Sequence, residues 1–172
     1  MIYDGFDKTA VGKVKSKVEK DSEVINRVVE AIINPYCKDL DNYVTFIKDC
    51  LKDGEHPPTD SELEDFCLNL ASYIYFAGGM CEQLGIKDDI SRALYKETYN
   101  KARSSQNEGT VADKDSLAEL YAQQEHLTNI CYNRAFKTLK AKIENSQELL
   151  SSCKKVLTRR MQEYNLTNME IK

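Results

Sequence analysis

The sequence has no tryptophan, only three prolines, seven glycines and two histidines in 172 residues. It also lacks any run approaching the ~18 apolar residues that a membrane-spanning helix needs. Its first twenty residues hold five lysines and no long apolar stretch, which is unlike a secretory leader. With 41% hydrophobic and 30% charged residues, the composition is typical of a globular chain. We therefore expect a soluble, cytoplasmic protein with no membrane contact.

Motifs that carry enzymatic chemistry are also missing. The sequence has no GxxxxGK[ST] phosphate loop, no GxGxxG, no GxSxG and no HExxH. The two histidines, His56 and His126, are far apart in sequence, and a di-iron helical bundle would need a glutamate at the position of Gln123. We predict a protein that is not an enzyme and needs no metal or other cofactor.

Six cysteines are spaced 13 to 50 residues apart, with no CxxC pair. Disulfide scaffolds are dense in short chains, whereas an isolated cysteine in an apolar helical pattern behaves as a small hydrophobic residue. We expect reduced, unpaired thiols at Cys37, Cys50, Cys67, Cys81, Cys131 and Cys153.

Apolar residues recur at helical spacing throughout the chain. In the N-terminal region, one helix begins near Asp21 and is expected to end at Asn34-Pro35, and a second runs to Leu51, which together predict a helical hairpin. A third helix follows a capping box (Thr59 with Glu62, or Ser61 with Glu64), is interrupted at Gly78-Gly79 and closes at Leu84-Gly85. A fourth is expected from about Ile90 to Arg103, capped by Asp88 or Asp89.

The C-terminal region has neither glycine nor proline after Val111 and is rich in strong helix formers. One helix over residues 113–164 would span roughly 78 Å, so it must bend or pack against another chain. A 3,4 apolar spacing favours self-association along a coiled-coil-like seam, with packing inside the chain as the alternative. The seam consists of Phe136, Leu139, Ile143, Leu150, Cys153 and Leu157, with Ser146 between them.

These elements predict an all-α fold with an N-terminal helical region that includes the hairpin, a long C-terminal helix, and an oligomeric helical assembly. We divide the chain into a flexible basic N-terminus (1–20), a helical N-terminal region (21–85), and a C-terminal part (86–172) with the basic and long helices.

Charge is distributed unevenly along the chain. Residues 21–65 hold twelve acidic and four basic residues, a net charge of −8, whereas residues 134–160 hold eight basic and two acidic residues, a net charge of +6. Such polarity favours an anionic partner, above all nucleic acid, or head-to-tail contact with an acidic neighbour. The alternative is that both are ordinary solvated helix faces.

A second basic cluster combines cations with aromatic rings on the expected fourth helix. Their spacing places Arg92, Tyr95, Lys96, Tyr99 and Arg103 on one face, with Lys101 to one side. Cations that follow phosphates and rings that stack on bases are the usual means of holding single-stranded nucleic acid. In the alternative interpretation, the tyrosines are core residues and the cations extend past them to solvent.

The run from Arg92 to Arg103, the polar loop with Glu108-Gly109, and the long helix that opens at 112–115 and ends in 157–161 together resemble the phage recombination-mediator family UvsY. The resemblance covers about residues 90–164, roughly half the chain. It implies a small helical homo-oligomer that binds single-stranded DNA and helps to load a RecA-like recombinase while displacing a single-strand-binding protein. By position, the DNA contacts would fall on Lys96, Tyr99, Lys101 and Arg103.

Two other functions fit the same sequence. One is a phage assembly protein, such as an adaptor or scaffold, whose acidic and basic ends join subunits. The other is an inhibitor whose acidic region 21–65 mimics DNA and blocks a host nucleic-acid enzyme.

Overall fold

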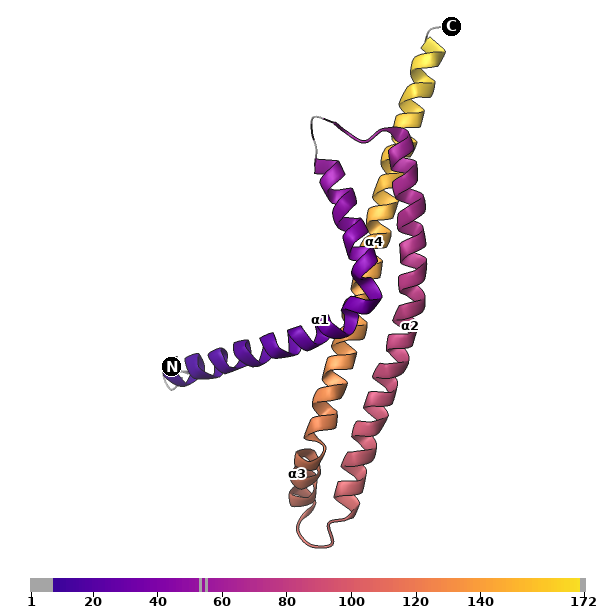
Figure 1. The fold of residues 1–172 in the computed structure, drawn as a ribbon. Helices are drawn as coiled ribbons and strands as arrows, with labels where there is room; N and C mark the ends of the chain where they lie inside the picture. The colour runs from indigo at the N-terminus through magenta and orange to yellow at the C-terminus, as the bar shows by residue number, and fades with distance from the viewer. Residues whose placement is uncertain (1–7, 53, 55, 171–172) are drawn as a thin grey trace.

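The computed structural model describes the backbone of residues 8–52, 54 and 56–170, and it confirms the predicted all-α fold. The described residues form four helices and no strand: α1 (Lys8–Lys52), α2 (Asp60–Ser104), α3 (Val111–Tyr121) and α4 (Gln123–Glu170). Figure 1 shows α2 and α4 running antiparallel along the whole molecule, with the C-terminal part of α1 packed beside them at one end. Within the described residues, no helix is both long and apolar enough to cross a membrane.

Helix α1 replaces the predicted hairpin, so that prediction was wrong. The helix continues through Pro35 from Lys8 to Lys52. Proline inside a helix removes one backbone hydrogen bond and crowds the carbonyl one turn earlier, which bends a helix without necessarily ending it. Figure 1 shows α1 turning sharply near its middle. Residues 8–20, predicted to be flexible, belong to this helix, and residues 1–7 lie outside the described part.

Helix α2 likewise joins two segments that were predicted to be separate. It starts as expected at the Thr59–Glu62 capping box and then runs through Gly78, Gly79 and Gly85 to Ser104. None of these three glycines has the positive φ of a helix end; among the described residues only Gly109 does. A Cβ at Gly85 would lie 3.2 Å from the Phe136 ring, so this glycine allows α2 and α4 to approach closely. It serves helix packing rather than termination.

The predicted long C-terminal helix is interrupted once. A capping box between Thr110 and Asp113 opens α3, which ends at Tyr121. Ala122, with φ −92° and ψ 9°, leaves helical geometry before α4 begins at Gln123. Ala118 and Ala122 are both fully buried, so the break lies where the short helix packs closely against its neighbours.

The hydrophobic core joins α1 from Val29 onward to α2 and α4. Its fully buried large side chains are Ile47, Leu63, Leu70, Leu84 and Leu139. We call this part of the molecule, where residues 29–52 of α1 pack on the two long helices, the closed half. All six cysteines are unpaired, as predicted. Burial, helped by a hydrogen bond to Asp41, raises the pKa of Cys37 to about 11, which keeps it a neutral core thiol.

The seam predicted for self-association lies in this core. Leu139, Ile143 and Cys153 are buried, and the rest of the seam packs against the core as partly buried residues: Phe136, Leu150 and Leu157. They contact other helices of the same chain, which is the alternative left open above. Contacts of this seam with other copies stay a prediction.

Candidate functional site

The basic–aromatic stripe of α2 faces α3 and α4 and is largely engaged within the chain. The Tyr99 hydroxyl donates to Asp115 Oδ1 at 3.1 Å, and Arg103 Nε lies 2.6 Å from the same oxygen. Partial burial, together with the hydrogen bond to Asp115, raises the pKa of Tyr99. The Tyr95 ring packs 4.8 Å from the His126 ring. Both tyrosines are half-buried, as the core interpretation expects.

The remaining cations of the stripe differ in how they are held. Lys101 forms an ion pair with Glu97 one turn earlier, and Arg92 pairs with Asp88 at 3.1 Å. Lys96 is exposed. The side chains of Arg92, Lys101 and Arg103 nonetheless expose 47%, 74% and 48% of their surface. The six predicted residues thus do share one region of α2, but the two rings point mainly into the protein.

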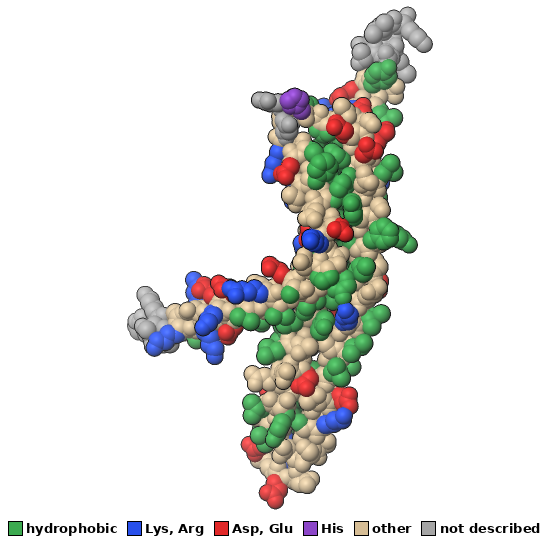
Figure 2. All heavy atoms as spheres, in the orientation of Figure 1, with side chains coloured by type: hydrophobic (Ala, Val, Ile, Leu, Met, Phe, Trp, Pro, Cys, Tyr) green, Lys and Arg blue, Asp and Glu red, His purple; other side chains and the backbone are tan. Residues whose placement is uncertain are grey.

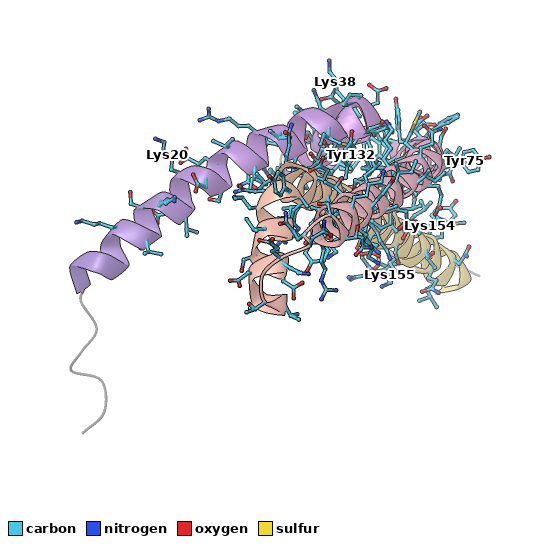
Figure 3. The ribbon with its side chains drawn as sticks, turned by 90° about the horizontal axis from the view of Figure 1, so that it is seen from below. Lys20, Lys38, Tyr75, Tyr132, Lys154 and Lys155 are labelled. Atoms are coloured by element: carbon cyan, nitrogen blue, oxygen red, sulfur yellow. The ribbon has the colours of Figure 1, made fainter. Side chains whose placement is uncertain are left out.

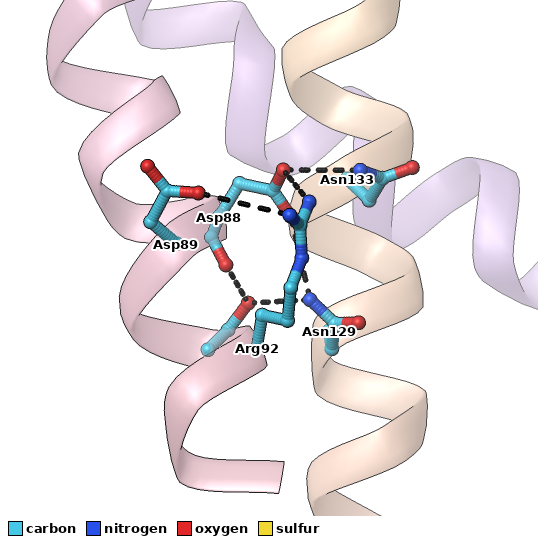
Figure 4. Close-up of polar contacts among 6 residues, drawn as sticks. Asp88, Asp89, Arg92, Asn129 and Asn133 are labelled. Atoms are coloured by element: carbon cyan, nitrogen blue, oxygen red, sulfur yellow. Dashed lines mark hydrogen bonds and ion pairs between the residues drawn. The ribbon is translucent and has the colours of Figure 1, made fainter. Parts of the chain in front are cut away.

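A buried polar cluster lies between α2 and α4 around Asp88 (Figure 4). Asn133 Nδ2 donates to Asp88 Oδ2 at 3.0 Å, and Asn129 Nδ2 donates to Asp88 Oδ1 at 3.3 Å and to Ser91 Oγ at 3.0 Å. Arg92 supplies the compensating positive charge. Sequence reasoning took Asp88 for a helix cap. The spacing of Asn129 and Asn133, one turn apart on an otherwise apolar face, was the available signal for this cluster.

The acidic and basic regions of the sequence meet inside one chain. Lys142 Nζ lies 2.7 Å from Asp41, and Arg160 Nη1 contacts Asp60 at 3.1 Å and the Pro58 carbonyl at 2.7 Å. Asp41 of α1 and Asp60 at the start of α2 are therefore paired with cations of α4 in the same chain. Lys154 and Lys155 remain exposed on α4 (Figure 3).

An exposed apolar surface lies on α1 before it reaches the core. We call residues 8–28 of α1 the arm, which in Figure 1 points away from the two long helices. Apolar residues recur along it at 3,4 spacing, interrupted only by Asp21: Val14, Val18, Ile25 and Val28. Val14 and Val18 expose 63% and 60% of their surface. Figure 2 shows apolar side chains along the edge of the arm that faces the rest of the bundle.

A second apolar surface lies on the outer face of α2. The side chains of Leu68, Tyr75, Phe76 and Ile86 each expose at least 60% of their surface. Tyr75 projects away from the bundle in Figure 3, and its ring contacts that of Phe76 edge to face, 5.6 Å between centroids. Isolated exposed apolar residues are normal, whereas a row of large ones marks a contact surface.

A cavity of about 490 Å³ beside the turn between α1 and α2 is lined by aromatic and acidic side chains, including Tyr43, Phe46 and Asp65. Across the part of the chain that the structure describes, no three His, Cys, Asp or Glu side chains gather as a metal-binding group. Comparison of the chain with protein-family models, curated proteins and solved structures found no match. Function must therefore be inferred from the geometry of the chain itself.

Proposed function

We propose that the protein is a non-enzymatic, self-assembling helical scaffold that acts by docking helix faces onto other copies of itself. The observation that carries this proposal is the arm: its apolar seam continues the seam of the core but lies outside the bundle, where the described residues leave it uncovered. Leaving such a face in water forgoes about 25 cal/mol for each Å² of apolar surface that could be buried.

The outer face of α2 supports the same proposal. A scaffold needs more than one contact surface in order to grow beyond a closed pair. The arm and the outer face of α2 are separate surfaces on the same chain, each rich in exposed apolar side chains. Assembly then requires neither a cofactor nor a catalytic group.

Light scattering coupled to size-exclusion chromatography tests the proposal directly. We expect the mass to exceed the 19.7 kDa of one chain and to rise with concentration. Changing Tyr75 and Phe76 to serine should reduce the largest species while leaving the helical circular-dichroism signal intact, because neither side chain belongs to the core. A strictly monomeric wild type across a hundredfold concentration range would refute the scaffold proposal.

Single-stranded DNA binding is the second candidate, in the manner of a recombination mediator whose protein partners are a RecA-like recombinase and a single-strand-binding protein. It is supported by the resemblance to UvsY and by the accessible cations of α2. Lys101 and Arg103 form ion pairs at the surface, and such pairs contribute only about 0–1 kcal/mol, so phosphate groups can replace the carboxylates at little cost.

Fluorescence anisotropy of a labelled single strand across a salt series tests this candidate, with duplex DNA as control. We expect log affinity to fall by about 0.7 for each phosphate contacted per decade of salt. Lys96→Ala should weaken binding to all sequences and reduce that slope. Glu97→Ala, which frees Lys101, should leave binding unchanged or strengthen it. No binding at low salt would exclude this candidate and leave the scaffold proposal standing.

A further inference from the structure

We infer that the arm of one copy docks along a second copy, on the apolar track of the bundle that no α1 helix covers. This inference rests on the proposed self-assembly and names its partner surface. We call the receiving region the open half: residues 86–104 of α2, together with α3 and residues 123–134 of α4. There the two long helices lack the third long helix that completes the closed half (Figure 1).

The α2 side of the track is the continuation of a face that already contacts α1. Lys87 Nζ donates to the Tyr36 hydroxyl at 2.6 Å, which fixes the side of α2 that meets α1. Ile90 and Leu94 follow Lys87 by three and seven residues and so lie on the same side of the helix. They expose 55% and 51% of their surface.

The α4 side of the track follows from the same reasoning. Lys142 contacts Asp41 of α1, and Cys131 lies eleven residues, or three helical turns, before it on the same face. Leu127 is one further turn along and exposes 47% of its surface. Tyr121, at the end of α3, is exposed at the same end of the bundle. The face that binds α1 in the closed half thus remains apolar in the open half.

The arm matches this track in length and pattern. Residues 12–28 of the arm span about 26 Å, and residues 86–104 of α2 span about 29 Å. The seam of α1 keeps its spacing from the core outward, through Ile32 and Ile25 to Val18 and Val14. A second copy's arm can therefore make the contacts in the open half that residues 29–52 make in the closed half.

Charge favours the same placement. Residues 12–20 of the arm carry four lysines and one glutamate, a net charge of +3, whereas residues 105–125 around α3 carry five acidic residues and one lysine, a net charge of −4. When the arm lies parallel to the C-terminal part of α1, its basic N-terminal residues reach the acidic region around α3 of the second copy. Opposite charges of this kind steer association and fix its register.

The bend in α1 determines whether the track can be covered by the arm of its own chain or only by the arm of another copy. It directs the arm away from its own open half (Figure 1), and Lys20 lies well clear of the bundle in Figure 3. In a dimer with two-fold symmetry, the arm of each copy can pack on the apolar track of the other copy. Both arms are then buried.

Cysteine cross-linking between differently labelled chains tests the inference. In a Cys50→Ser/Cys131→Ser background, one chain carries Val14→Cys or Val18→Cys and the other carries Ile90→Cys or Leu94→Cys, so that four pairings sample the register. After mixing and mild oxidation, we expect a disulfide-linked heterodimer on a non-reducing gel for at least one pairing. Leu166→Cys, 63% exposed near the C-terminal end of α4 and outside both proposed contact surfaces, is the control and should not link.

Each outcome separates the inference from the proposed function. If wild type assembles but no arm–track pairing links, the inference is overturned and self-assembly stands. If a chain carrying both cysteines links only within itself, the arm closes onto its own bundle and the inference is also overturned. Val14→Lys/Val18→Lys should abolish the dimer at concentrations where wild type is dimeric, with an unchanged circular-dichroism signal, and a persisting dimer would contradict the inference.

Discussion

The two parts of α1 carry the same apolar spacing but have different surroundings. From Val29 onward the seam is buried against α2 and α4, whereas in the arm Val14 and Val18 remain exposed. Apolar spacing alone therefore does not decide whether a residue of α1 is buried. Burial depends on where α1 bends and on which helices lie beside it on each side of the bend. The bundle shows the matching difference, because its closed half has a complete core and its open half keeps an apolar track.

Replacing one apolar side chain in the closed half and one in the arm should give the largest contrast in stability. Leu70→Ala, at a fully buried position in the closed half, should lower the free energy of unfolding by about 2–5 kcal/mol because it leaves a cavity. Val18→Ala in the arm should change the stability of the monomer by no more than about 0.5 kcal/mol. Urea denaturation at a concentration that keeps the protein monomeric measures both. Similar losses at the two sites would mean that the arm packs onto the bundle of its own chain.

The polar cluster around Asp88, at the boundary of the open half, should contribute somewhat less to the free energy of unfolding than the core does. Asp88→Ala removes the acceptor of the Asn133 amide and one of the two acceptors of the Asn129 amide, and we expect the free energy of unfolding to fall by about 2 kcal/mol. Asp89→Ala is the matched control, since the neighbouring side chain is 78% exposed and should cost less than about 0.5 kcal/mol. Thermal and urea unfolding would both report the difference. Equal effects would show that the cluster does not hold α2 to α4.

The smallest expected effect is the pH dependence of the two helix caps. Hydrogen bonds from Thr59 and Thr110 lower the pKa of Glu62 and Asp113, respectively. A lowered folded-state pKa contributes stability that is present above the unfolded value, 4.5 or 3.8, and is lost as the pH falls through the folded value. Wild type should therefore lose more stability on acidification than Glu62→Gln or Asp113→Asn.

Unfolding midpoints between pH 7 and pH 3 check this prediction. The carboxamide variants provide the control because they keep the shape of the cap but cannot titrate. Parallel curves for wild type and Glu62→Gln would show that the cap of α2 does not contribute to acid sensitivity. If Asp113→Asn reduces the loss of stability on acidification more than Glu62→Gln does, the cap of α3 in the open half is the more acid-sensitive one.

The candidate site was only partly accessible from sequence. Spacing correctly placed Tyr95, Tyr99 and Arg103 on one side of a helix, but whether that side faces solvent or α3 depends on the position of another helix. Asp115, which accepts from Tyr99 and pairs with Arg103, lies across a loop, and its role required the tertiary fold. The prediction that Asp88 or Asp89 caps a helix was made without knowledge of α4, which supplies the partners of Asp88.

By itself, the sequence determined the helical character of the chain, the cap at Thr59, and the apolar seams, because all three depend on interactions within a few residues. Only the tertiary structure decided that α1 and α2 continue through Pro35 and Gly85, and that the seam of α4 packs within the chain. These outcomes depend on long-range packing. A helix crosses a weak position when burial on both sides offsets the local cost, and no short segment of sequence contains the partner that provides this burial.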